Sequence, residues 1–188
     1  MDAPDVGPTV SAMVARAEMD VSDRTSATMR VTDIEREHGD ALFGFARRQG
    51  IDDAVAEDVV QEALLRLYDA FIAGTLIEDP RAWTFTVCYR LAMDEHRRRE
   101  RAARLAPVPN PGPSDADDPG SLIEQRAVWS EVDRLPERQR SVLYLRYRAD
   151  LPFEAIGSVL GITASAARSH ATQAVATLRL RLSAEGSR

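Results

Sequence analysis

Apolar residues recur along the chain at spacings of three and four, which is typical of amphipathic helices. The clearest example lies in residues 54–71, whose apolar stripe comprises Val60, Leu64, Leu67 and Phe71. We find no convincing alternation of apolar and polar residues that would indicate a half-buried strand. The pattern therefore predicts an all-α protein.

Two helical domains are predicted, because a proline-rich segment interrupts the helical pattern. Residues 105–121 contain five prolines and two glycines, which cannot hold a helix. This linker separates a domain at 33–104 from a domain at 122–182. At about 3.1 Å per residue it reaches roughly 55 Å, more than the ~34 Å of one DNA turn. Residues 1–32 and 183–188 are expected to be flexible tails, and Met29 is an alternative start.

The predicted N-terminal domain contains three helices. Asp33 is expected to cap the first, which ends near Gly50, and Asp52 or Asp53 to cap the second. A loop at 72–80 precedes a third helix at 81–104. The expected inward side chains of that helix are Trp83, Val87, Leu91 and Cys88.

A second face of the 54–71 helix has a different composition. It comprises Asp58, Gln61, Glu62 and Leu65. Two acids, an amide and an exposed leucine on one surface favour protein docking, with a plain solvated face as the alternative.

On the 81–104 helix, aromatic and guanidinium groups are expected to share the outer surface. Tyr89, Arg90 and Arg97 belong to it, with Trp83 beside them. Such pairs suit unstacked bases, because every base offers a π-face next to a phosphate. The alternative places Trp83 simply in the core.

The segment at 153–173 has the layout of a helix-turn-helix. Gly161 supplies the turn and Thr163 is a suitable cap for the last helix. A buried row of that helix is predicted to comprise Ala167, Ala171, Ala174 and Leu178. Its outward side chains are then Ser165, Arg168, Ser169, Thr172 and Gln173.

Charge is unevenly distributed, although the formal net charge is only −6. Residues 33–80 hold twelve acids and four arginines, whereas 81–104 hold three acids and seven arginines. Residues 123–188 hold seven acids and ten arginines. An acidic face for a protein partner and two basic faces for nucleic acid fit this distribution, and solvated surfaces are the alternative.

Three blocks of the sequence resemble the sigma-70 initiation factors of bacterial RNA polymerase, in the compact extracytoplasmic-function (ECF) group. In the order of family regions 2.2, 2.3–2.4 and 4.1–4.2, the blocks are AEDVVQEALLRLY, DPRAWTFTVCYRLAMDEHRRR and LPERQRSVLYLRYRADLPFEAIGSVLGITASAARSHATQAVATLR. The resemblance implies a sigma-2-like bundle and a sigma-4-like helix-turn-helix. It also implies core RNA polymerase (β′ clamp helices and β flap), promoter DNA and an anti-sigma factor as partners.

The resemblance further assigns roles to positions of this chain. The polymerase-binding face would be Asp58, Gln61, Glu62 and Leu65. The −10 element would be held by the 72–80 loop with Trp83, Tyr89, Arg90, Arg97 and Arg98. The −35 element would be read by Thr163, Ser165, Arg168, Ser169, His170, Thr172 and Gln173. Core polymerase would supply much of the nonspecific DNA affinity, which reconciles an acidic chain with DNA reading.

Two segments depart from the family pattern. The usual ARN of region 2.4 is replaced by Cys88, Tyr89 and Arg90, and the usual basic string of the reading helix by AARSHATQAV. Phosphate contacts are then expected from Arg146, Arg148 or Arg179. Recognition of DNA shape is expected to contribute more to promoter selection.

Two other classes of protein compete with this interpretation. A free-standing helix-turn-helix regulator explains 122–182 but leaves the 58–65 face without a role. A metal enzyme would use Asp52, Asp53, Glu57, Asp58, Glu62 and His38, yet acids in the first turn of a helix are expected from its dipole. There is no Gly-rich phosphate loop, nucleophile elbow or HExxH. We expect no catalytic activity, cofactor or metal.

Cysteine content and apolar segments indicate the cellular compartment. The single cysteine excludes an internal disulfide, and no apolar run approaches 18 residues. The acidic N-terminus lacks the apolar segment of a secretory signal. We therefore expect a cytoplasmic protein without membrane insertion.

Overall fold

The computed structural model describes residues 10–105 and 123–185, with side chains placed at 21–102 and 128–183. Within these ranges every regular element is an α-helix, which confirms the all-α prediction. The first three helices are α1 (Val10–Arg47), α2 (Asp53–Ile72) and α3 (Pro80–Leu105). The remaining four are α4 (Ile123–Asp133), α5 (Glu137–Tyr147), α6 (Phe153–Leu160) and α7 (Ala164–Glu185). The predicted linker lies almost wholly at 106–122, outside the described residues.

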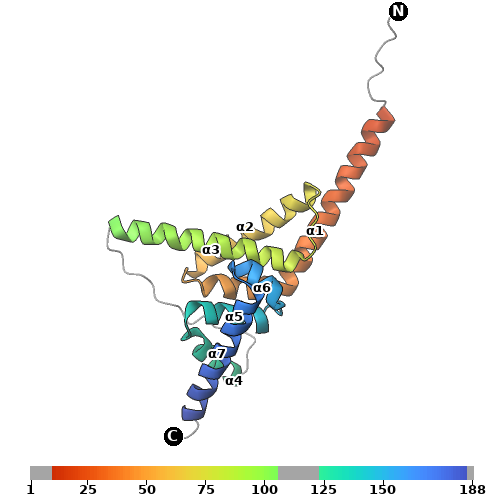
Figure 1. Ribbon diagram of the computed structural model, residues 1–188. Coiled ribbons are helices and arrows are strands. Elements are labelled where there is room, and N and C mark those ends of the chain that lie inside the picture. Colours follow the sequence, from red (N-terminus) through yellow and green to blue (C-terminus); the bar gives the residue numbers. More distant parts are fainter. Residues whose placement is uncertain (1–9, 106–122, 186–188) are drawn as a thin grey trace, which may run out of the picture.

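Helix α1 corrects the prediction of a flexible tail for residues 10–32, because it already begins at Val10, whereas residues 1–9 lie outside the described residues. Its N-terminal half projects away from the other helices (Figure 1). No proline or glycine occurs between residues 9 and 38, so nothing in the chain stops the helix there. Asp33 consequently lies inside α1 and pairs with Arg36 at 2.7 Å, rather than capping a helix start.

Helix α2 begins where the sequence indicates. Asp52 is its N-cap and accepts a hydrogen bond from the Val55 amide at 3.0 Å. The predicted stripe packs inward, with Val60, Leu64 and Leu67 buried. Phe71 is half-buried, and the Arg30 guanidinium lies 3.6 Å from its ring centroid. At the start of α3 the Asp79 carboxylate accepts from the Ala82 amide at 3.0 Å.

Helices α6 and α7 form the predicted helix-turn-helix. Gly161 ends α6 with a φ of 66°, a left-handed conformation that glycine adopts at little cost. A Cβ at Gly157 would stand 2.7 Å from the Ile162 carbonyl oxygen, so this glycine lets the turn fold back against α6. Thr163 caps α7 by accepting from the Ala166 amide at 3.1 Å. Pro136 is the N-cap residue of α5.

The two halves of the chain pack directly on each other. Helix α3 lies along α6, and α1 contacts α5, as Figure 1 shows for segments far apart in the sequence. The rings of Phe45 and Tyr144 stack across this boundary with centroids 6.0 Å apart, and buried residues of both halves form one continuous core. The two predicted domains are therefore packed together, with α6 of the helix-turn-helix against α3.

Candidate protein and nucleic-acid interfaces

The predicted docking face of α2 points away from the core. Its four side chains, at Asp58, Gln61, Glu62 and Leu65, are all exposed. Leu65 is 59% exposed, although its neighbour Leu64 is only 4% exposed. Glu62 accepts from Arg66 Nε at 2.8 Å, one turn further along. The structure thus places an isolated leucine among acidic and amide groups, on the side of α2 opposite its buried stripe.

The predicted base-holding face of α3 is only partly open. Trp83 and Tyr89 are half-buried against the core, and Arg90 is exposed. The Tyr89 ring lies 6.1 Å from that of Phe45, and its hydroxyl accepts from Arg138 Nη1 at 3.2 Å. Arg138 also donates to the Leu160 carbonyl at 2.9 Å, so it links Tyr89 to the end of α6.

Further along α3 the predicted arginines are exposed and locally paired. Arg97 Nη2 contacts Asp94 Oδ1 at 2.6 Å, and Arg98 Nη1 contacts Glu95 Oε2 at 3.4 Å. Exposed pairs at these spacings are weak, so both guanidinium groups can exchange partners at little cost.

The predicted reading face of α7 is open to solvent. Ala167, Ala171, Ala174 and Leu178 are buried, as the spacing predicts. The exposed members of the reading face are Thr163, Ser165, Arg168, Ser169, Thr172 and Gln173. His170 differs: it is half-buried, and its Nδ1 is shielded from solvent without a hydrogen-bond partner.

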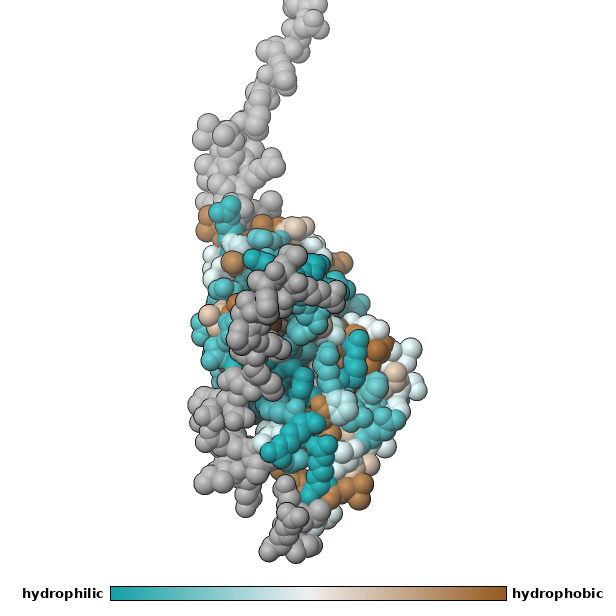
Figure 2. Space-filling model, turned by 90° about the vertical axis from the view of Figure 1, so that its left-hand side faces the viewer, coloured by the Kyte–Doolittle hydropathy of each residue, from teal (hydrophilic) through white to brown (hydrophobic). Residues whose placement is uncertain are grey.

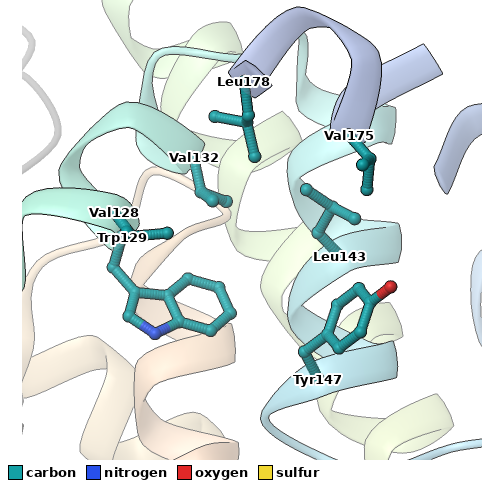
Figure 3. A pocket seen from close by; sticks show the side chains of 7 residues that line it. All are labelled: Val128, Trp129, Val132, Leu143, Tyr147, Val175 and Leu178. Atoms are coloured by element: carbon teal, nitrogen blue, oxygen red, sulfur yellow. The ribbon is translucent and has the colours of Figure 1, made fainter. Parts of the chain in front are cut away.

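An apolar groove lies between α4, α5 and α7 (Figure 3). Its volume is about 440 Å³. The lining side chains are Val128, Trp129, Val132, Leu143, Tyr147, Val175 and Leu178. This groove was not predicted, although the apolar residues of 122–135 spaced by three and four were a signal for it. Tyr147 at its edge is 64% exposed.

Local pKa shifts have simple causes. The pKa of Asp52 is lowered, first by the Val55 amide and then by Arg99, both of which stabilise the carboxylate. Burial raises the pKa of the Cys88 thiol to about 12, as expected for a small core residue rather than a reactive one. The pKa of His38 is lowered by its partial burial and by the neighbouring Arg81.

The described residues include no cluster of three or more side chains suited to a metal ion, so the acids from Asp52 to Glu62 and His38 do not form one. In the same residues, none of the helices has the length and apolar character needed to cross a bilayer. Figure 2 shows one face of the surface as mostly hydrophilic, with hydrophobic residues in small groups.

Comparison with known families gives the class of protein. Residues 35–102 match sigma-70 region 2, and residues 132–180 match sigma-70 region 4. The first range covers the C-terminal part of α1, all of α2 and most of α3. The second range includes the helix-turn-helix. The chain therefore belongs to the sigma-70 family of RNA polymerase sigma factors, in its ECF group.

Curated relatives agree with this assignment. ECF sigma factor SigL of Mycobacterium tuberculosis is 31% identical over 150 residues, which cover 78% of this chain and 85% of SigL. ECF sigma factor SigJ of the same species is 35% identical over 158 residues. These cover 78% of this chain and 49% of SigJ, so the chain spans about half the length of that relative.

Solved structures share the arrangement of helices. CnrH in complex with the cytosolic domain of CnrY is 25% identical, with a TM-score of 0.56 over 88% of this chain and 95% of CnrH. RpoE from Bartonella quintana, in complex with the anti-sigma factor NepR, has a TM-score of 0.63. It is 20% identical, and the match covers 80% of this chain and 97% of RpoE. At this identity the match to RpoE shows that the two chains share a fold.

Proposed function

We propose that the chain binds core RNA polymerase through the exposed face of α2 and directs initiation at selected promoters. The observation that carries this proposal is Leu65, which is 59% exposed between acidic and amide side chains. An exposed leucine rimmed by polar groups is the composition of a small protein-docking patch. The β′ clamp helices of the polymerase are the partner that the family assignment supplies.

DNA is contacted in two places under this proposal. The loop before α3, with Trp83, Tyr89 and the arginines Arg90, Arg97 and Arg98, holds the melted −10 strand, because aromatic rings and guanidinium groups suit unstacked bases. The α7 face at 163–173 reads the −35 duplex from the major groove, as the second helix of a helix-turn-helix does.

Promoter contact requires the two halves to separate. The hydroxyl of Tyr89 is held by Arg138, and α6 lies along α3, so a flipped base cannot stack fully on Tyr89 in the packed arrangement. The proline-rich segment between Leu105 and Ile123 is long enough to let the two regions reach DNA more than one turn apart.

Other partners follow from the same assignment. The groove between α4, α5 and α7 suits an apolar segment of the polymerase β flap, since valine, leucine and aromatic side chains line it. An anti-sigma factor is proposed as a further partner, since the RpoE neighbour is in complex with the anti-sigma factor NepR. The chain would act in the cytoplasm, where the polymerase is found. It would have no catalytic activity of its own and need no cofactor or metal.

A free-standing helix-turn-helix regulator is the less favoured function. It accounts for α6 and α7 but gives no role to the α2 face, and region 2 matches independently of region 4.

Substitutions on the exposed face of α2 test the proposal. Glu62→Arg, Asp58→Arg and Leu65→Asp should each weaken binding to core polymerase by about tenfold, equivalent to about 1.4 kcal/mol. The matched control is Asp23→Arg, which changes an exposed acid of α1 away from this face. Co-purification with core polymerase and a binding titration provide the measurement. Wild-type affinity in all three α2 variants would exclude this docking face.

A further inference from the structure

We propose that Phe153 and Glu154, in the first turn of α6, hold Arg168 of α7 in position and so set the base preference of the reading helix. This inference rests on the proposed −35 contact. It assigns positioning residues on the first helix of the helix-turn-helix, outside the helix that enters the groove.

Arg168 is the one arginine between Thr163 and Gln173. Its guanidinium carbon lies 5.1 Å from the centroid of the Phe153 ring, and its Nη2 lies 3.7 Å from Glu154 Oε1. Both partners belong to α6. The orientation of the arginine on the reading face is therefore restricted by contacts from a neighbouring helix.

Phe153 itself is fixed. It is half-buried and packs against the core. The Arg146 guanidinium also lies over its ring, at 5.4 Å from the centroid, and donates to the Leu151 carbonyl at 3.1 Å. Because the ring cannot follow Arg168, it acts as a platform that restricts the guanidinium before DNA arrives. A fork oriented in advance loses less conformational freedom when it binds guanine O6 and N7.

Glu154 competes with DNA for the Arg168 guanidinium. Its carboxylate is 72% exposed and offers Arg168 an alternative partner. At a matching base pair, guanine acceptors replace the carboxylate. At other base pairs Arg168 finds no pair of acceptors to replace the carboxylate and stays with Glu154, so it adds no base contact there. Glu154 therefore disfavours wrong sequences, whereas Phe153 favours the right one.

The experiment uses the full chain assembled with core RNA polymerase. The probe is a duplex DNA library randomised over the upstream promoter segment, and sequencing of the bound DNA gives the base preference. Phe153→Leu should lower the preference at one base pair by about threefold to tenfold, whereas Phe153→Tyr, which keeps the ring, should stay within about twofold of wild type. Glu154→Gln should increase binding to non-preferred sequences and lower the same preference by about threefold.

Arg168→Ala separates this inference from the function on which it rests. If Arg168→Ala leaves every base preference unchanged, the proposed reading face is wrong. If it removes one preference that Phe153→Leu and Glu154→Gln both retain, only the positioning role is overturned. Equal losses in Phe153→Leu and Phe153→Tyr would likewise overturn it, because they would indicate packing. Thermal melting followed by circular dichroism checks that each variant is folded. If Phe153→Leu does not fold, the base preference of Glu154→Gln tests the positioning role.

Discussion

Arg48 and Asp133, 85 residues apart in the chain, form a two-pronged ion pair between its N-terminal and C-terminal halves. Arg48 Nε donates to Oδ1 at 2.8 Å and Nη2 to Oδ2 at 3.3 Å. The same guanidinium lies 4.6 Å from the Tyr144 ring centroid, and the Arg48 carbonyl accepts from Arg140 Nη2 at 3.0 Å. Arg48, which directly follows α1, thus contacts three residues of the opposite half.

Removing this arginine should weaken the packing of the two halves. The Arg48 side chain is 10% exposed, so Arg48→Ala leaves Asp133 without this partner in a partly buried position. We expect the free energy of unfolding to fall by about 1–3 kcal/mol, measured by urea denaturation.

The control for this variant is Arg36→Ala, which removes an exposed pair with Asp33 and should leave the free energy of unfolding almost unchanged. Equal effects of the two substitutions on the free energy of unfolding would show that the Arg48–Asp133 pair stabilises the chain no more than an exposed pair does. Small-angle scattering should also report a larger radius of gyration for Arg48→Ala.

Gly44 offers an independent probe of the same boundary. A Cβ added there would collide with the Tyr144 hydroxyl, so Gly44→Ala should lower the free energy of unfolding by about 1–3 kcal/mol. Gly39→Ala, in the same helix, would meet only Glu35 Cγ at 3.9 Å and should raise stability by about 0.5–1 kcal/mol.

A double-mutant cycle identifies the cause. Tyr144→Phe removes the colliding oxygen, so Gly44→Ala should cost less in that background than in wild type. An unchanged cost would place the strain elsewhere in α1.

Asp52 predicts a pH-dependent contribution to stability. Its carboxylate is stabilised in the folded chain by the Val55 amide and by Arg99, so its folded pKa lies below its ordinary value. Its contribution is then present above the unfolded pKa and is lost as pH falls through the folded pKa. Asp52→Ala should reduce the free energy of unfolding by about 1 kcal/mol at pH 7, and by less near pH 3.

The comparison requires urea denaturation of both proteins at the two pH values. Asp52→Asn, which keeps a capping oxygen without the charge, should show a smaller pH dependence than the wild-type residue. A difference between wild type and Asp52→Ala that is constant with pH would contradict the assigned cause.

Local patterns in the sequence predicted local structure well. The buried alanine row of α7, the Thr163 cap and the Gly161 turn all follow from spacing and backbone preference within a few residues. The outward position of Leu65 follows in the same way, because α2 has one clear apolar stripe and Leu65 lies off it.

Contacts between distant segments could not be predicted in this way. Nothing near Arg48 indicates that its partner is Asp133, and nothing near Tyr89 indicates Arg138. The helix from Val10 was missed for another reason: serine, threonine and aspartate suggested a flexible tail, but no residue between 9 and 38 breaks a helix.

The most direct test of the account measures polymerase binding and DNA selection together. Purified chain is mixed with core RNA polymerase and a genomic promoter library, and complex formation and run-off transcripts are recorded, with the chain alone as the parallel sample. We predict a stable complex that initiates at a defined set of promoters, while the chain alone binds the same duplexes only weakly. Tight duplex binding by the chain alone, without association with core polymerase, would contradict the account.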